Sequence, residues 1–281
     1  MKFVSFLRAD GSASYGRVDG DTVIDLGKDQ QAPASLKAAI AQGVLGQLTS
    51  DDKLELAAVS LLPVIPDPGK ILCVGLNYEN HRQETGRAAA DHPAIFTRFS
   101  DTLIGQGQAI ICPRVSTKLD YEGELAVVIG KGGRDISVDD APAHIAGYAC
   151  FNDASVRDWQ KHNIQFTPGK NFPGTGAFGP WLVTPDEAGD LSEQRVTTRL
   201  NGQVVQDQPI ADMIWSVADI IAYISTFTPL SPGDVIATGT PGGVGAKRTP
   251  PLWMKAGDSV EVCIGKVGTL VNPIRDQADD E

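Results

Sequence analysis

The segment Leu119–Gly130 carries an acidic residue at every second position of its first half. Successive side chains of a β-strand point to opposite faces, so Asp120, Glu122 and Glu124 are predicted to project from one face. Three carboxylates on one face repel each other unless a positive charge lies among them. Mg²⁺ and Ca²⁺ prefer oxygen ligands, so a divalent cation is one interpretation of this pattern. An exposed edge strand that uses acids for solubility is the other.

Two further segments place titratable side chains directly after expected strands. His81 and Glu84 follow an apolar strand expected at residues 70–74, and three positions apart on a helix they can touch. A carboxylate that orients an imidazole makes that histidine a suitable general base. Asp153 comes just after the strand expected over residues 145–151, and at that strand's end it can add an oxygen ligand. The alternatives are a solvated polar helix for the first pair and a helix N-cap for Asp153.

Two glycine-rich loops and one short polar segment complete the candidate residues. Lys170 stands in a loop too rich in glycine to be helical, where it can hold a carbonyl or enolate oxygen. Thr240 lies in a second glycine loop whose hydroxyl and N–H groups can bind an anion. Arg157 and Gln160 share one face if a helix begins there, and Arg157 can grip a carboxylate. For both glycine stretches an ordinary tight loop is the alternative.

Composition and charge narrow the classes of partner. The 281 residues carry 35 acids and 24 bases, a formal charge of −11, which disfavours nucleic acid and anionic membranes as partners. No run approaches the ~20 apolar residues of a membrane span. The four cysteines lie far apart without a C-x-x-C pair, which is typical of reduced thiols. We therefore expect a cytoplasmic protein that acts on a small molecule.

The chain divides at a proline-rich link over residues 63–69. Before it, residues 2–26 suggest a small sheet, and short helices are expected over residues 33–60, one of them at 54–58 after an acidic cap. The predicted domains are therefore a small N-terminal α+β domain, residues 1–66, and a larger domain, residues 67–281.

The larger domain is predicted to be β-rich. Its strands are separated by glycine and proline, and Asn201-Gly202 is a strong two-residue hairpin signal. One clear helix is expected at 216–225, and the acidic end of the chain, 276–281, is expected to be frayed. The strand–helix alternation of a doubly wound sheet is missing, so the fold class is mixed α/β with strands predominating.

Taken together, these segments resemble the fumarylacetoacetate hydrolase family over roughly residues 68–275. Each motif alone is weak, but their combination and order are specific. The resemblance implies a catalytic domain with a rolled, mixed β-sheet, which is commonly dimeric, so a homodimer is expected. The matching motifs are Gly75-Leu-Asn-Tyr-x-x-His81, Asp120-Tyr-Glu-Gly-Glu-Leu-Ala126, Asn152-Asp-x-x-x-Arg-Asp-x-Gln160, Gly169-Lys-x-Phe172 and Thr238-Gly-Thr-Pro-x-Gly-Val-Gly245.

The resemblance also implies a metal centre. Glu122, Glu124 and Asp153 match the family's metal carboxylates, for which Mg²⁺ or Mn²⁺ is the usual ion. Asp120 is then a carboxylate that supports the ligands from outside the coordination sphere.

The organic part of the site follows from the same resemblance. His81 matches the general base on a mobile lid, Glu84 the acid that orients it, and Lys170 the residue that binds the substrate's oxo group. The positions near the substrate are Arg157, Gln160 and Thr240.

These roles favour a divalent-metal-dependent hydrolase that cleaves a C–C bond in 2,4-dioxo, acylpyruvate-type acids. Pyruvate and a carboxylic acid are the products, in aromatic or sugar-acid catabolism. Water attacks the 4-carbonyl after the His81–Glu84 pair removes its proton, and a pyruvate enolate leaves. An oxaloacetate decarboxylase or a 2-hydroxydienoate isomerase on the same site is the alternative. A non-catalytic binding protein on this fold is a third reading.

Overall fold

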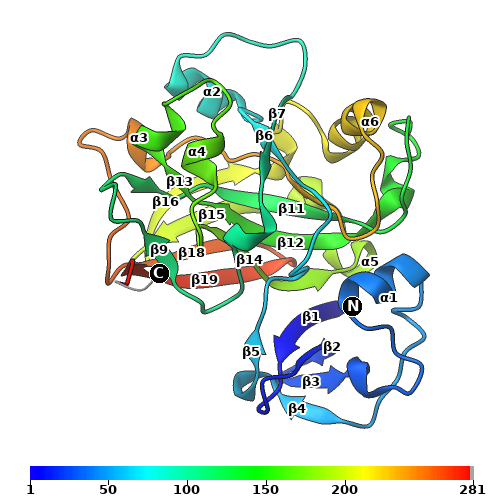
Figure 1. Cartoon of the computed structure of the whole chain (residues 1–281). Coiled ribbons are helices and arrows are strands. Elements are labelled where there is room, and N and C mark those ends of the chain that lie inside the picture. The colour runs from blue at the N-terminus through cyan, green and yellow to red at the C-terminus, as the bar shows by residue number, and fades with distance from the viewer. Residues whose placement is uncertain (279–281) are drawn as a thin grey trace.

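A large mixed sheet runs through most of the chain in the computed structural model, which describes residues 1–278 (Figure 1). Its main path is β4-β3-β2-β1-β14-β12-β11-β17-β6-β7, with β5 paired to β1 and β8 paired to β14. The strands of this sheet are β1 (Lys2–Leu7), β2 (Ala13–Asp19), β3 (Thr22–Asp25), β4 (Lys53–Glu55), β5 (Ser60–Leu61), β6 (Ile71–Gly75), β7 (Ala94–Arg98), β8 (Leu103–Ile104), β11 (Gly123–Ile129), β12 (Ile145–Asp153), β14 (Gly176–Val183) and β17 (Val235–Ala237).

A second sheet of five strands, in the order β16-β15-β18-β19-β9, packs against the first, and β10 pairs with β13 separately. These strands are β9 (Ile110–Cys112), β10 (Leu119–Asp120), β13 (Ser155–Val156), β15 (Arg195–Leu200), β16 (Gln203–Pro209), β18 (Ser259–Ile264) and β19 (Gly268–Asp276). The α-helices are α1 (Leu36–Gln42), α2 (Glu79–Thr85), α3 (Arg157–Gln160), α4 (Thr167–Lys170), α5 (Pro185–Ala188) and α6 (Val217–Phe227). Short 3₁₀ turns lie at Leu26–Lys28, Leu56–Ala58, Ser100–Thr102, Ala141–His144, Leu191–Glu193, Ile210–Asp212 and Gly245–Lys247.

The expected fold class, mixed α/β with strands predominating, is confirmed. Strand β11 explains how the two layers are organised, because all seven of its residues are buried. Its alternate side chains belong to two different clusters, with Leu125 and Val127 in one and Ala126 and Val128 in the other. A strand buried on both faces is apolar along its length. Strand β11 is apolar in this way from Leu125 to Ile129, after Glu124. Strand β11 therefore fixes the position of Glu124 rigidly.

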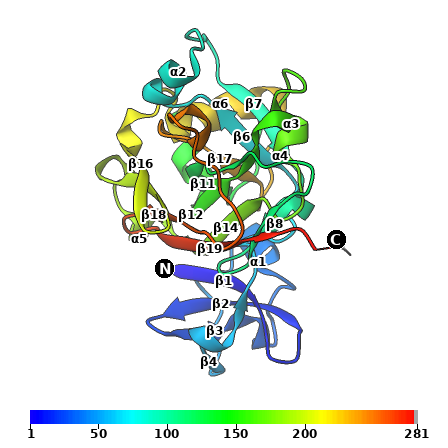
Figure 2. The same ribbon diagram turned by 90° about the vertical axis from the view of Figure 1, so that its left-hand side faces the viewer.

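The N-terminal strands continue the main sheet (Figures 1 and 2). Strand β1 pairs with β14, where Phe3 lies opposite Leu182. The proline-rich link is not an exposed linker, because Val64 and Ile65 are buried. The expected N-terminal strands are present, but they belong to the 12-stranded sheet and do not form a separate one, because β1 pairs with β14. The exact domain boundary stays a prediction.

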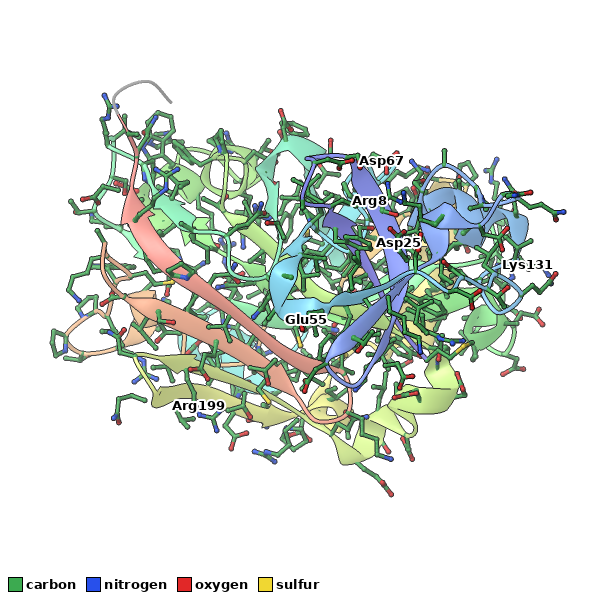
Figure 3. The ribbon with its side chains drawn as sticks, turned by 90° about the horizontal axis from the view of Figure 1, so that it is seen from below. Arg8, Asp25, Glu55, Asp67, Lys131 and Arg199 are labelled. Atoms are coloured by element: carbon green, nitrogen blue, oxygen red, sulfur yellow. The ribbon has the colours of Figure 1, made fainter. Side chains whose placement is uncertain are left out.

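A partly buried ion pair between Arg8 and Asp25 links the N-terminal strands. Figure 3 shows Arg8 and Asp25 side by side, and Arg8 Nε donates to Asp25 Oδ2 over 2.6 Å. The Asp25 carboxylate also accepts from the hydroxyl of Ser14 at 2.5 Å. A buried carboxylate is tolerated when it is paired in this way.

Several local predictions are confirmed. Helix α6 begins after Ser216, whose side chain forms a reciprocal capping box with Asp219. At the β15–β16 hairpin Asn201 has φ 51° and Gly202 has φ 77°, as a type I′ turn requires. Among the described residues, no helix is both long and apolar enough to cross a bilayer.

Other local predictions are wrong. The helix expected at 54–58 is instead strand β4 followed by a 3₁₀ turn, because Leu54 pairs with Val23 and extends the N-terminal sheet. The acidic strand is interrupted at Tyr121 and Glu122, since β10 pairs with β13 and β11 with β12. Strand β19 was not foreseen, and it contains Pro273, a residue that argues against a strand.

At the end of the chain, Asp276 closes β19 rather than being frayed. The last residues of the expected frayed tail, 279–281, lie outside the described part of the chain.

One core cluster contains Phe3 of the N-terminal strands together with Phe151 of β12 and Phe178 of β14, and it gives a stability prediction. Phe178 is fully buried, with its ring centroid 5.6 Å from that of Phe151. Phe178→Ala should lower the free energy of unfolding by about 3–5 kcal/mol because it leaves a cavity. Phe99→Ala, at a 53% exposed position, should change it by no more than about 0.5 kcal/mol. Equal effects of the two substitutions in chemical denaturation would contradict this account of the core.

Candidate active site and metal centre

Three carboxylates meet where β11 begins and β12 ends. The strands are antiparallel, with Glu124 opposite Phe151, and the Asp153 N–H donates to the Glu122 carbonyl at 2.9 Å. This register brings Glu122, Glu124 and Asp153 together although 29 to 31 positions separate Asp153 from the two glutamates. Each offers a carboxylate oxygen within 4.8 Å of the others, and all three side chains are buried.

Three buried cations, Lys170, Arg98 and Arg157, contact this group. Lys170 Nζ lies 2.6 Å from Glu122 Oε2 and 2.5 Å from Asp153 Oδ2. Arg98 pairs with the other oxygen of Asp153 and donates to the Ala154 carbonyl at 2.5 Å. The loop predicted around Lys170 is in fact the one-turn helix α4, and the lysine is its last residue.

Asp120 belongs to a neighbouring layer of the charge network rather than to the carboxylate group. Its Oδ2 accepts from Arg157 Nε at 2.7 Å and from the Ala246 N–H, and its Oδ1 accepts from the Gly245 N–H. Arg157 extends a second nitrogen to Glu122 Oε1 at 2.6 Å. Asp120 therefore orients Arg157, which in turn holds Glu122. The expectation that Asp120 shares a face with the two glutamates is wrong, because the strand breaks between them.

The electrostatic balance singles out one acid. Burial alone would raise the pKa of Glu122, but Arg157 and Lys170 lower it to about 2. Burial also raises the pKa of Glu124, and there the nearby Asp153 and Glu122 raise it further. Glu124 has no cationic partner within hydrogen-bonding distance among the described residues and accepts only from the Gly239 N–H, at 2.8 Å.

This arrangement fits a divalent cation. Asp120, Glu122 and Asp153 pair with three cations, Arg98, Arg157 and Lys170. Among the described residues, Glu124 is therefore the acid of this network that lacks a cationic partner. Hard oxygen donors that converge in a buried site are the ligands that Mg²⁺ and Mn²⁺ take. Glu122, Glu124 and Asp153 could therefore hold such an ion.

The predicted His81–Glu84 pair is formed on helix α2. His81 Nδ1 lies 2.7 Å from Glu84 Oε1, and the imidazole is buried. When Glu84 accepts from Nδ1–H, the opposite nitrogen Nε2 is left as a proton acceptor. The second oxygen of Glu84 accepts from the Gly243 N–H at 2.9 Å, so the glutamate ties α2 to the glycine loop. Asn80 makes a similar contact with Gly242 at 3.0 Å.

The glycine loop after β17 is shaped by close backbone contacts. Gly239 has φ 104°, and a Cβ there would lie 2.7 Å from the Cβ of Asn77. Only glycine allows its N–H to reach Glu124 in this conformation. The Thr240 hydroxyl donates to the Gly123 carbonyl at 3.0 Å and accepts from Gln206 at 2.8 Å. The hydroxyl of Thr240 is therefore used to hold the loop onto β11.

One cavity of about 560 Å³ joins these groups. Figure 1 shows α2, α3 and α4 gathered at the end of the molecule opposite the N-terminal strands, and they contribute to its walls. Arg157 donates to Gln160 at 3.0 Å, while its Nη2 is buried without a protein partner. Seven of the ten predicted site residues line this cavity, and Glu84 contacts one of them, His81. The seven are His81, Glu122, Glu124, Arg157, Gln160, Lys170 and Thr240.

Three supporting residues were missed at the level of the sequence. Arg98 ends the short strand β7. A charged residue at the end of an apolar strand could have indicated a buried ion pair, such as the one that Arg98 forms with Asp153. Gln206, which holds both Thr240 and the Gly123 N–H, gives no such signal in a polar hairpin. Asn80 is likewise an ordinary polar residue on a predicted polar helix.

Comparison with known proteins identifies the family. The model of the fumarylacetoacetate (FAA) hydrolase C-terminal domain matches residues 70–275, which is most of the chain. The chain belongs to the fumarylacetoacetate hydrolase family. The family resemblance of the sequence is thus confirmed.

Relatives of known name within the family include oxaloacetate tautomerases. One from Xenopus laevis, a mitochondrial protein, is 37% identical over 98% of this chain and 90% of its own length. One from Bacillus subtilis is 38% identical over 92% of this chain and 94% of its own.

Solved structures agree. The fumarylacetoacetate hydrolase from Exiguobacterium antarcticum has a TM-score of 0.88 at 35% identity, covering 99% of this chain and 100% of that one. A 2-hydroxyhepta-2,4-diene-1,7-dioate isomerase from Mycobacterium marinum has a TM-score of 0.80 at 30% identity over the same shares.

The charge balance predicts opposite effects for two isosteric substitutions. Asp153→Asn leaves Arg98 and Lys170 without their shared carboxylate, so it should destabilise the metal-free protein by about 3–5 kcal/mol. Glu124→Gln removes a buried acid that has no cationic partner, so it should not lower the melting temperature. Both should abolish binding of Mn²⁺ measured by calorimetry. A destabilised Glu124→Gln protein would show that this charge is already compensated without metal.

Proposed function

We propose that this enzyme moves a proton between C3 and the 2-oxo oxygen of a 2-oxo acid, as in the tautomerisation of oxaloacetate. The observation that carries the proposal is the buried carboxylate group with Lys170 against it and His81 facing the same cavity. The names of the relatives from Xenopus laevis and Bacillus subtilis support the same reaction.

Two cationic side chains, Lys170 and Arg157, are proposed to bind the oxygens of the substrate. Burial alone lowers the pKa of Lys170, but Asp153 and Glu122 raise it above its ordinary value. Lys170 therefore stays protonated, and it donates to the 2-oxo oxygen as this oxygen becomes an enolate. The free Nη2 of Arg157 binds the adjacent carboxylate of the substrate.

His81, on helix α2, carries out the proton transfer at carbon. Toward the enol, His81 Nε2 takes the proton from C3 and Lys170 protonates the enolate oxygen, while Glu84 stabilises the imidazolium. The imidazolium then gives a proton to solvent and Lys170 regains one, and toward the keto form each transfer runs in reverse. A divalent ion, when bound by Glu122, Glu124 and Asp153, supplies Lewis acidity at the 2-oxo oxygen.

Decay of enol absorbance tests this proposal. Freshly dissolved enol-oxaloacetate with the Mg²⁺- or Mn²⁺-loaded protein should lose its enol signal faster than buffer alone. Lys170→Met should reduce the rate by about 10²–10³-fold, because the enolate charge loses its donor. Lys131→Gln, an exposed residue outside the cavity, is the control. An unchanged rate with the loaded protein would refute the proposal, and pyruvate measured in parallel would reveal decarboxylation instead.

Hydrolysis of acylpyruvates is the second candidate. The His81–Glu84 pair favours it, because this arrangement can also remove a proton from water. The loss of an enolised diketone, followed by its absorbance, measures this activity. His81→Ala should reduce it by about 10²–10⁴-fold, since attack needs an activated water. If the pair serves carbon acids alone, no acylpyruvate will be cleaved even by the unaltered protein.

Assembly as a homodimer is also proposed, on the family resemblance alone. Sedimentation at micromolar concentration tests it, and a mass corresponding to one chain would overturn it.

A further inference from the structure

Gly243 is a point of contact between helix α2 and the glycine loop, and both polar groups of its backbone are used. Its N–H donates to Glu84 Oε2 at 2.9 Å, and its carbonyl accepts from the Tyr121 hydroxyl at 3.1 Å. Arg248 Nε donates to the same carbonyl at 3.2 Å and to the Tyr121 hydroxyl oxygen at 3.0 Å. The carbonyl, the hydroxyl and the guanidinium therefore form a triangle of hydrogen bonds behind the residue that holds Glu84.

Arg248 anchors this triangle to the second sheet. Its Nη2 donates to the Val205 carbonyl at 2.5 Å, and Val205 lies on the edge strand β16. Gly243 packs against the same carbonyl, because a Cβ at this position would clash with the Val205 oxygen, and its φ is 101°. Both observations explain why a glycine stands here. Helix α2 and β16 lie on the same side of the molecule (Figures 1 and 2).

The contacts of Arg248 depend on the shape of its guanidinium rather than on its charge. Its acceptors are two main-chain carbonyls and one phenol oxygen, and it forms no ion pair within residues 1–278. A guanidinium presents its N–H donors in a fixed planar fork, which a lysine ammonium cannot reproduce. Arginine is therefore suited to hold the glycine loop and β16 in one fixed arrangement.

The position of Tyr121 in the chain suggests a different role, because it stands between Asp120 and Glu122. Its main-chain N–H does donate to Asp120, at 2.9 Å. Its hydroxyl, however, donates to the Gly243 carbonyl. The main chain of Tyr121 therefore belongs to the charge network, while its side chain supports the glycine loop.

We propose that Tyr121 and Arg248 are positioning residues for the proposed base, His81. They fix the Gly243 N–H, which holds one oxygen of Glu84, so that the other oxygen stays on the imidazole Nδ1. The opposite nitrogen of His81 then remains the proton acceptor. This role rests on the proposed function only in that His81 is the base.

Two conservative substitutions test the role without turnover. Tyr121→Phe removes one hydroxyl, and Arg248→Lys keeps the charge but loses the fork. In both variants, amide hydrogen exchange over residues 79–85 should be roughly tenfold faster than in the unaltered protein, because the docking of α2 is weakened. The ¹⁵N resonances of the His81 imidazole, identified by their absence from His81→Gln, should shift away from the tautomer protonated at Nδ1.

Tyr15→Phe and Arg195→Lys are the matched controls. The Tyr15 hydroxyl is buried without a protein partner on the N-terminal strand β2, and Arg195 forms an exposed ion pair with Asp207 on the second sheet. Neither substitution should change the exchange of α2 or the imidazole resonances. Unchanged exchange and unchanged resonances in Tyr121→Phe and Arg248→Lys would overturn the proposal.

Calorimetric titration with Mn²⁺ separates this role from an effect on the carboxylate group. The affinity should be the same in both variants as in the unaltered protein, and a loss as large as the gain in exchange would also overturn the proposal. In the enol-oxaloacetate assay kcat should fall about tenfold with KM unchanged, because substrate binding is intact and only the base is misaligned. If the loaded, unaltered protein lacks this activity, the proposed function fails, whereas the exchange and the resonances still decide the positioning role.

Discussion

The site depends on a buried network of opposite charges that is one cation short. Each of Asp120, Glu122 and Asp153 faces an arginine or a lysine, and only Glu124 lacks such a partner. Removing ions from water is costly unless they are paired and hydrogen-bonded. The network therefore does two things: it stabilises the fold where the charges match, and it leaves one carboxylate without a cationic partner, where a divalent ion can bind.

The backbone explains why these charges stay in place. An antiparallel register between the buried strand β11 and the largely buried strand β12 fixes two of the three carboxylates. A third strand, β17, pairs with β11 and leads into the glycine loop that covers them. A Cβ at Gly245 would lie 1.8 Å from the Leu252 carbonyl, so this loop can reach Asp120 only as glycine. Main-chain contacts, rather than flexible side chains, set the distances on which the chemistry depends.

Much of this could be predicted from the sequence, and the exceptions have physical reasons. Alternating acids and a glycine-rich loop with one lysine are local patterns, so they indicated residues that the structure brings together, Glu122, Glu124 and Lys170. The break after Asp120 could not be foreseen, because it arises from pairing with β13, which lies 35 positions further along the chain. The role of Arg98 depends on a similar long-range contact. Strand β4 was mistaken for a helix because an edge partner outweighed its local preference.

The two contacts of the Glu84 carboxylate couple the position of helix α2 to the orientation of His81. One of its oxygens orients His81, and the other is held by the Gly243 N–H of the loop that also covers the carboxylate group. If α2 swings away, the base loses the docking contact that keeps its orienting acid in place. The proposed base is thus oriented only while α2 is docked on the glycine loop, which would confine proton transfer to a closed cavity.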